Sequence, residues 1–205
     1  IEHLLSTSVH AYLLFFTDQG KVYRAKAHEL PKTTRTAQGS LIHNVLSMSQ
    51  DEKVQAIIDT RDYETEKFLL IMTEKGTIKK SAFKDFDSNY KSLQAIKLKD
   101  DDKVVSVKTT SGTEDVILVS RKGQAIRFDE NNLKPQGRTA MGVRGIKLRE
   151  GDKVVGAATS RDETLLFVTA KGYGKRTNLD EFRKAGRGGM GVKALKVTEV
   201  KGDLI

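Results

Sequence analysis

The sequence predicts an all-β fold, a propeller-like array of four-stranded units. The first observation is a repeat with a period of about fifty residues, marked by a glycine at the same place in each copy: Gly20, Gly76, Gly123 and Gly172. The second is that no segment shows the apolar spacing of a helix. Repeated four-stranded units without helices are typical of propeller-like arrays.

Each repeat holds a β-hairpin around this hairpin glycine. Two apolar runs flank a Thr/Ser-x-x-Gly tetrad in residues 13–30, 69–86, 116–133 and 165–182. The spacing favours a tight turn in which the glycine takes a positive φ. We therefore expect a strand, a turn and a second strand in every copy.

Two further runs complete each unit. An apolar run upstream of the hairpin occupies residues 3–8, 53–59, 103–109 and 153–159. A glycine-centred turn and a last run follow the hairpin at residues 35–48, 138–148 and 187–197, whereas residues 88–98 of the second copy lack that glycine. These runs predict two more strands in each unit.

The repeats define the expected domain organisation. We expect one domain with blades at residues 1–48, 49–98, 99–148 and 149–198. Residues 199–205 resemble the start of a further blade. The chain is therefore expected to be a fragment of a longer array.

Composition excludes several classes of protein. The 205 residues contain no Cys, which excludes a disulfide framework, a thiolate zinc site and a cysteine nucleophile. No apolar run approaches the roughly 20 residues that cross a bilayer, and the N-terminal segment lacks the pattern of a signal peptide. We expect a cytoplasmic protein without a membrane partner.

The charge is basic and follows the repeat. Lys and Arg number 36 against 27 Asp and Glu, a formal net charge of +9. The positive excess lies in the hairpin-and-turn halves, residues 15–48, 70–98, 117–148 and 166–197, while the remaining residues are net negative. A basic stripe repeated from blade to blade suits the regularly spaced phosphates of a nucleic acid.

The expected ligand is duplex DNA, bound through its backbone. Aromatic residues make up only 6% of the chain and Trp is absent, which argues against stacking of single-stranded bases, and no base-reading helix is apparent. The alternative is a scaffold whose basic rim binds an acidic protein surface. The candidate DNA-binding residues are the basic side chains of the hairpins and turns: Lys21, Arg24, Arg35, Lys79, Lys80, Lys84, Arg121, Lys122, Arg127, Arg138, Arg144, Lys171, Lys175, Arg176, Arg183, Lys184, Arg187 and Lys193.

No constellation of catalytic residues is apparent. The histidines His3, His10, His28 and His43 all lie in the first unit without metal-ligand spacing. The acidic runs at 100–102 and 150–152 precede a predicted strand and are expected to be loops. The stretch GRGGMG at 186–191 lacks the Lys-Ser/Thr ending of a phosphate loop. We expect no catalytic site, metal or cofactor in this chain.

Four stretches carry a family resemblance: LLFFTDQGKVYR (13–24), RTAQG (35–39), RTAMGVRGIKLREGDKVVG (138–156) and TAKGYGKRTNLDEFRKAGRGGMGVKAL (169–195). They resemble the C-terminal domain of the A subunit of bacterial DNA gyrase over essentially the whole chain. The resemblance implies a β-pinwheel that wraps duplex DNA around a basic outer rim and supports ATP-dependent negative supercoiling. It also implies two partners, the B subunit of gyrase and the rest of the A subunit, with ATP and Mg²⁺ used elsewhere in that enzyme.

The sequence departs from this family in two ways. The family's domain has about six blades, and this chain supplies four and the start of another. The family's Gln-Arg-Arg-Gly-Gly-Lys-Gly box is absent, and Arg187–Gly191 is a degenerate echo of it. The A-type subunit of topoisomerase IV is the alternative resemblance, but the recurring RTAxG turns favour gyrase.

Overall fold

The chain forms a series of small antiparallel sheets. The computed structural model describes residues 3–61, 66–99, 101–161 and 163–205. Its strands are β1 (Tyr12–Thr17), β2 (Lys21–Lys26), β3 (Val54–Asp59), β4 (Phe68–Thr73), β5 (Thr77–Ala82), β6 (Ser92–Gln94), β7 (Val104–Thr110), β8 (Asp115–Ser120), β9 (Gln124–Asp129), β10 (Val143–Arg144), β11 (Val154–Thr159), β12 (Thr164–Val168), β13 (Gly174–Asn178) and β14 (Val192–Lys193). One short α-helix, α1 (Ile42–Leu46), and four 3-10 turns, η1 (Ala27–Glu29), η2 (Phe83–Phe86), η3 (Glu130–Asn132) and η4 (Leu179–Glu181), complete the described elements. The predicted all-β fold is confirmed.

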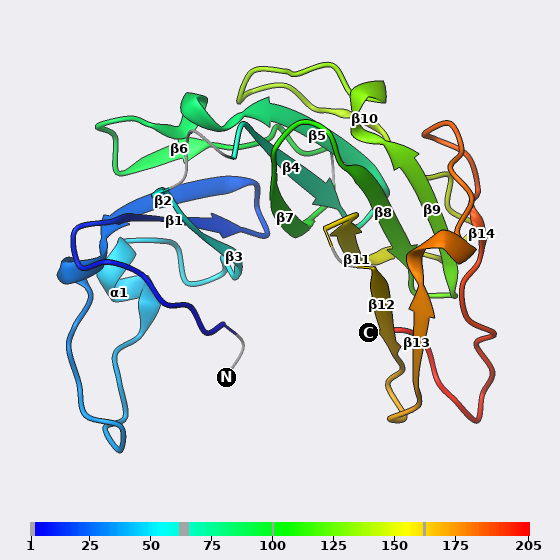
Figure 1. Ribbon diagram of the computed structural model, residues 1–205. Coiled ribbons are helices and arrows are strands. Elements are labelled where there is room, and N and C mark those ends of the chain that lie inside the picture. The colour runs from blue at the N-terminus through cyan, green and yellow to red at the C-terminus, as the bar shows by residue number, and fades with distance from the viewer. Residues whose placement is uncertain (1–2, 62–65, 100, 162) are drawn as a thin grey trace.

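The sheets are arranged as blades around an open arch (Figure 1). Blade 1 has the strand order β3-β1-β2-β6, blade 2 β7-β4-β5-β10 and blade 3 β11-β8-β9-β14, whereas blade 4 is the pair β12-β13. Strands β3, β7 and β11 line the inner side of the arch, and β6, β10 and β14 lie at its outer edge (Figure 1). The inner strands of neighbouring blades contact one another.

Each complete blade is assembled from two consecutive repeats. Strand β6 of the second repeat pairs with β2 of the first, β10 pairs with β5, and β14 pairs with β9. The inner strand of each blade also comes from the following repeat, since β3 of the second repeat pairs with β1 of the first and β11 of the fourth pairs with β8 of the third. The sheets therefore cut across the repeat boundaries predicted at residues 48, 98 and 148: a blade is one repeat's hairpin plus the first and last strands of the next repeat.

The hairpin glycine contacts the outer strand that the next repeat adds to the blade. The four hairpin glycines have φ between 77° and 85°, as the turn pattern predicted. The carbonyl oxygen of Gly123 also accepts the backbone N–H of Ala194 at 2.9 Å, just after β14. A Cβ on Gly123 would stand 2.2 Å from the carbonyl oxygen of Leu195. Glycine is thus required here for the turn and for the close approach of the next repeat.

Hydrophobic cores lie between successive blades. Strand β4 is buried on both faces: Leu69 and Ile71 pack in the core shared with blade 1, while Leu70 and Met72 pack in the core shared with blade 3. Alternation of side chains along a strand produces this division. It explains why the hairpin strands have continuous apolar runs rather than alternating ones.

Two segments of the first repeat differ from the prediction. Residues 3–8 form no strand, and residues 35–48 form an exposed loop followed by α1. In later repeats both segments pair with the hairpin of the repeat before. The apolar end of the second segment instead packs on blade 1, where Leu46 and Met48 join Leu13 and Phe15. Near the C-terminal end of the chain, Leu204 forms an isolated antiparallel β-bridge with Thr169. In the other blades an inner strand pairs at the equivalent position.

Candidate nucleic-acid interface

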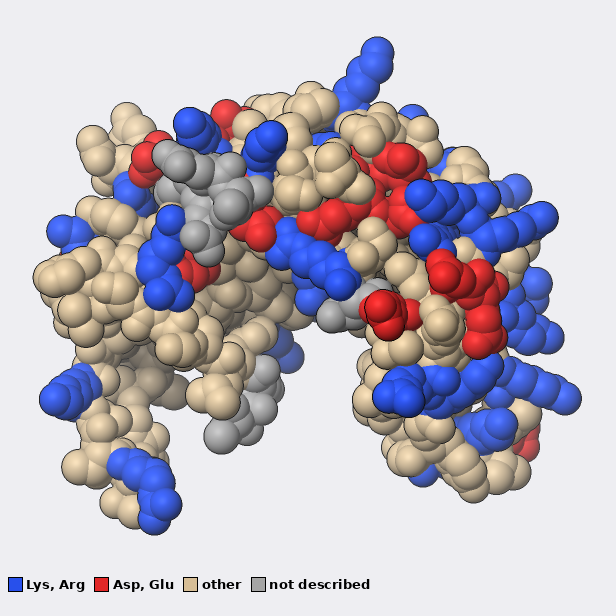
Figure 2. Space-filling view, viewed as in Figure 1, with Lys and Arg blue, Asp and Glu red and all other residues tan. Residues whose placement is uncertain are grey.

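The outer edge of the arch carries exposed cations at equivalent positions. In the last run of the third repeat, Arg144 of β10 and Lys147 just after β10 are exposed, while Gly145 and Ile146 between them are buried. The last run of the fourth repeat shows the same pattern, with Lys193 of β14 and Lys196 exposed on either side of buried Ala194. Figure 2 shows Lys and Arg side chains gathered on the outer flank of blades 3 and 4, with Asp and Glu closer to the middle of this face. The edge is therefore a basic surface that follows the blades.

Most of the predicted DNA-binding residues are accessible. The exposed ones are Arg35, Lys84, Arg121, Lys122, Arg144, Lys171, Lys175, Arg176, Arg183, Lys184, Arg187 and Lys193, and Lys21 and Arg138 are half-buried. Several are already engaged within the protein. Lys21 pairs with Glu52 at 2.7 Å, Arg121 with Asp203 at 2.7 Å and Lys184 with Asp115 at 2.9 Å. Only the Arg121–Asp203 pair is exposed at both members, and exposed pairs are weak, so Arg121 can exchange Asp203 for a phosphate at small cost.

The pair at Lys21 is the least exchangeable of these. Its partner Glu52 is fully buried and also accepts a hydrogen bond from the Tyr23 hydroxyl at 3.1 Å. The hydrogen bond that Lys21 donates to Glu52 raises the pKa of Lys21. Removing the ammonium from Glu52 would leave a buried carboxylate short of its cation, which favours a structural role for Lys21.

Lys79 is buried, and its ammonium points into the protein. It exposes 1% of its surface, and its ammonium donates to the carbonyl oxygens of Ala95, of Gly137 at 3.1 Å and of Arg138 at 2.7 Å. Burial lowers the pKa of Lys79 to about 8. The prediction that this residue contacts DNA does not fit its position, because its nitrogen holds the turn of the third repeat in place.

Three other residues that were predicted to bind DNA have largely buried side chains. The side chains of Arg24, Lys80 and Arg127 are 12%, 4% and 12% exposed, and each pairs with a carboxylate. We therefore leave Arg24, Lys80 and Arg127 out of the candidate interface, together with Lys79. Position in the repeat did not distinguish these covered cations from exposed ones such as Arg176.

Three exposed lysines of the outer edge were not among the predicted residues. Lys97, Lys147 and Lys196 occupy the same place in the last run of the second, third and fourth repeats, and all are exposed. The backbone N–H of Lys97 donates to Ala140 at 3.2 Å, and that of Lys147 donates to Gly189 at 2.8 Å. These bonds place each lysine beside the glycine turn of the following repeat. The signal was available as the aligned triplets Ile96-Lys97-Leu98, Ile146-Lys147-Leu148 and Leu195-Lys196-Val197.

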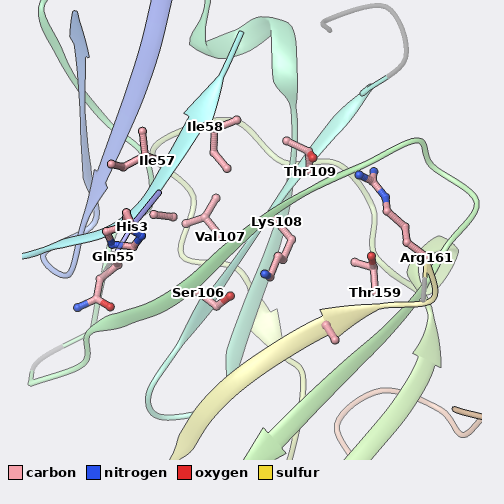
Figure 3. Close-up of a pocket in the computed structure, with 12 residues that line it drawn as sticks. His3, Gln55, Ile57, Ile58, Ser106, Val107, Lys108, Thr109, Thr159 and Arg161 are labelled. Carbon is pink, nitrogen blue, oxygen red and sulfur yellow. The ribbon is translucent and has the colours of Figure 1, made fainter. Parts of the chain in front are cut away.

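A polar cavity of about 450 Å³ lies on the inner side of the arch. Figure 3 shows its lining from the inner strands, with Ser106, Lys108 and Thr159 among the labelled side chains. Arg161 at its rim is held by Glu66 at 2.5 Å and by Glu114 at 2.9 Å, and these hydrogen bonds raise the pKa of Arg161. The described lining residues include no carboxyl group.

The described residues of the acidic runs, 101–102 and 150–152, form loops as predicted, and Asp100 lies outside the described residues. Asp102 accepts the backbone N–H of Lys75 at 2.9 Å, and Asp152 accepts that of Lys122 at 3.0 Å. Each carboxylate thus caps a hairpin turn from the repeat before. Across the ranges that the structure describes, no three His, Asp or Glu side chains gather as a metal site would require. No helix within those ranges is long and apolar enough to span a membrane.

Comparison with known proteins identifies relatives of this arrangement. The family model "DNA gyrase C-terminal domain, beta-propeller" matches residues 11–60, 67–111, 114–161 and 163–199. The first three matches each run from a hairpin to the inner strand of the same blade. Each of these matches thus contains three of the four strands of a blade, and the second and third also contain the outer strand, β6 or β10, of the blade before.

Two curated relatives are similar in sequence. The DNA gyrase A subunit of Clostridium acetobutylicum is 43% identical over 146 residues, which is 71% of this chain. The DNA gyrase A subunit of Staphylococcus aureus is 40% identical over 158 residues, which is 76% of this chain. The match spans 18% of the length of each relative.

Solved structures share the fold. A C-terminal domain of DNA topoisomerase IV superposes with a TM-score of 0.87 at 32% identity, covering 98% of this chain and 64% of that one. A DNA gyrase A C-terminal domain superposes with a TM-score of 0.82 at 29% identity, covering 97% and 65%. The E. coli ParC C-terminal domain, at 15% identity and a TM-score of 0.71, shows the shared fold alone.

Proposed function

Since this chain belongs to the DNA gyrase C-terminal domain family, we propose that it binds duplex DNA along the outer edge of its blades and bends the duplex around the arch. The observation that carries the proposal is the recurrence of exposed cations there. Arg144 and Lys193 occupy one equivalent position, and Lys97, Lys147 and Lys196 occupy another. A ligand that runs from blade to blade meets the same charges at regular intervals.

Backbone contacts explain the chemistry of this edge. Guanidinium and ammonium groups neutralise phosphates and release counterions, with a salt slope of about 0.9 for each phosphate contacted. Bending a site of 20–30 bp costs about 1–6 kcal/mol, which the added phosphate contacts must exceed. The outer strands β6, β10 and β14 are two or three residues long and offer no helix for the major groove, so we expect little dependence on DNA sequence.

The family relation suggests the setting of this activity. We propose that the chain acts as the DNA-wrapping part of a DNA gyrase A subunit. The wrap would support ATP-dependent negative supercoiling, together with the gyrase B subunit, the remainder of the A subunit, ATP and Mg²⁺. The cleavage chemistry would then belong to those other parts. No residue of this chain is assigned a catalytic role.

A topoisomerase IV A-type subunit is the second candidate. The observation in its favour is the superposition on a topoisomerase IV C-terminal domain with a TM-score of 0.87, beside 0.82 for a gyrase A domain. The curated relatives, which are gyrase A subunits at 40% to 43% identity, favour gyrase. Both candidates share the proposed binding of duplex DNA.

Binding to duplexes of equal length and scrambled sequence tests the proposal. Fluorescence anisotropy should give one affinity for all sequences, and the affinity should fall steeply as salt rises. The rival is a scaffold for an acidic protein surface, which would leave a duplex unbound at moderate salt. An affinity that does not change with salt would refute binding through phosphates.

A further inference from the structure

A basic residue stands four positions after every hairpin glycine. The four residues at this clasp position are Arg24, Lys80, Arg127 and Arg176. In the first three repeats the side chain lies at the junction with the next repeat and is at most 12% exposed. A phosphate outside the protein cannot reach these three charges, so their recurrence needs another explanation.

Each of the three covered clasp-position cations contacts a residue of its own blade. This residue is the first one of the neighbouring hairpin strand. The Arg24 guanidinium lies 3.6 Å from the centroid of the Tyr12 ring, and the Lys80 ammonium lies 4.2 Å from that of Phe68. In the third repeat Asp115 replaces the aromatic ring and accepts the Nε–H of Arg127 at 2.8 Å. Cations are attracted to the faces of aromatic rings as well as to carboxylates.

Each covered cation then reaches the 3-10 turn of the next repeat. Arg24 donates to Asp87 at 3.0 Å and to the carbonyl oxygen of Ser88, just after η2. Lys80 lies 2.9 Å from the carboxylate of Glu130, the first residue of η3. The same kind of contact thus recurs with different partners.

Arg127 makes the most extensive of these contacts. It donates to the carbonyl oxygens of Leu179 at 2.9 Å and Phe182 at 3.3 Å, and lies 3.5 Å from the Asp180 carboxylate. These groups belong to η4 and its C-terminal end. A guanidinium can hold several acceptors in one fixed geometry, which an ammonium cannot.

We propose that the clasp-position residues fix the angle between consecutive blades, and that Arg127 thereby positions blade 4 so that the basic outer edge keeps one curvature. The link to DNA rests on the proposed function, whereas the clasp between blades does not. The carbonyls and carboxylates of the next repeat are held at bonding distance by a side chain anchored in the previous blade. Loss of the side chain leaves the junction held by apolar packing, which is less directional, and by backbone hydrogen bonds such as that from the Ala185 N–H to the Arg127 carbonyl oxygen at 2.8 Å, none of which reaches η4 among the described residues.

Arg176 provides a matched control within the same protein. It occupies the clasp position of the fourth repeat, in β13, but its side chain is exposed. Within residues 3–61, 66–99, 101–161 and 163–205 it has no ring or carboxylate partner. In the 205-residue protein, Arg127→Gln and Arg176→Gln therefore remove the same charge from the same repeat position, once from a covered side chain and once from an exposed one.

The first arm of the experiment measures the angle between blades without DNA. Spin labels at Thr113→Cys and Thr164→Cys report on blades 3 and 4, and labelling is specific because the chain has no native Cys. Electron–electron double resonance should give one narrow distance distribution for the wild type and for Arg176→Gln, and a broadened or shifted one for Arg127→Gln. If Arg127→Gln does not fold cooperatively, Arg127→Lys replaces it and should give an intermediate width. Distributions identical to the wild type in the Arg127 variant would overturn the clasp.

The second arm measures the path of DNA on the 205-residue protein. A duplex with a dye at each end should show increased energy transfer when the wild type binds. Arg127→Gln should lose at least about half of that increase at saturating protein, with a salt slope changed by less than about one phosphate contact. Arg176→Gln should lower the salt slope by about 0.9 and keep the energy transfer of the bound state.

The outcomes separate the two proposals. A broadened distance distribution with unchanged energy transfer would confirm the clasp and overturn its role in the DNA path. A wild type that does not raise energy transfer would overturn the proposed bending of DNA, and the distance distributions would still decide the clasp.

Discussion

The Lys80 ammonium on β5 lies 2.9 Å from the Glu130 carboxylate of the next repeat, and neither side chain exposes more than 4% of its surface. Glu130 also accepts the Thr110 hydroxyl at 2.7 Å and the backbone N–H of Glu114 at 2.7 Å. The carboxylate is therefore satisfied on both oxygens while it joins blade 2 to the third repeat. The pair belongs to the interior of the protein, although sequence alone suggested a DNA contact for Lys80.

Removing one member of this pair should be costly. Lys80→Met leaves Glu130 charged and buried without its cation, so we expect a loss of about 3–5 kcal/mol in the free energy of unfolding. Urea denaturation measures this loss. Lys84→Met is the control, since Lys84 is an exposed residue a few positions along the chain and should change stability by less than about 0.5 kcal/mol. Equal effects of the two substitutions would refute the buried pair.

Glycine at the hairpin of blade 3 should be irreplaceable for a second reason besides its φ. Gly123→Ala places a Cβ against the backbone of the next repeat, whereas nothing lies within 4 Å of a Cβ on Gly172. The two glycines have φ of 83° and 80°. Gly172→Ala should therefore cost only the backbone strain of about 1–2 kcal/mol, and Gly123→Ala clearly more. Thermal unfolding of the two variants compares them, and equal losses would contradict the strand exchange.

The recurring outer lysines should contribute to DNA binding together. The triple variant Lys97→Gln, Lys147→Gln and Lys196→Gln should lower the salt slope by about 2.7, because three phosphate contacts are lost. The control neutralises Lys53, Lys103 and Lys108, three exposed lysines outside the last runs of the repeats. It changes the net charge equally but should alter the slope by less than one contact. Anisotropy titrations at several salt concentrations distinguish the two variants.

Stability should depend on pH through Lys79. Burial lowers the pKa of Lys79 to about 8 from an ordinary value of 10.5. Between these two pH values the unfolded chain binds more protons than the folded protein, so the free energy of unfolding should rise with pH. Lys79→Met should lack this rise, which we expect to be about 1–3 kcal/mol. Urea denaturation of both proteins at pH 7.5 and at pH 10, taken as roughly the two ends of this window, measures the difference. Parallel pH dependence in the two proteins would contradict it.

The hairpins could be predicted from sequence because their signals are local. The apolar runs and the glycine of each turn lie within a few residues, and all four hairpins form where expected. The exchange of strands could not be predicted. The apolar pattern of a repeat's last run is the same whether the run pairs with the hairpin of its own repeat or with that of the repeat before. Residues 35–48 show the consequence, because the same kind of segment forms a loop and α1 in the first repeat and an outer strand in the later repeats.

The candidate interface could be predicted only in part for a related reason. Position in the repeat located the basic surface but not the direction of each side chain. Arg127 and Arg176 share one position, yet Arg127 is covered by η4 of the following repeat and Arg176 is exposed. The direction depends on contacts between repeats, which a single repeat's sequence does not display. The outer lysines Lys97, Lys147 and Lys196 could have been found by aligning the last runs.

The most direct measurement is ligation of nicked circular DNA in the presence of the protein, followed by separation of topoisomers. Because a wrap around the arch has one hand, ligation should trap a linking difference of one sign that grows with protein concentration. The triple variant at Lys97, Lys147 and Lys196 should trap much less at the same concentration. A topoisomer distribution centred where it lies without protein, under conditions where the duplex is bound, would contradict wrapping.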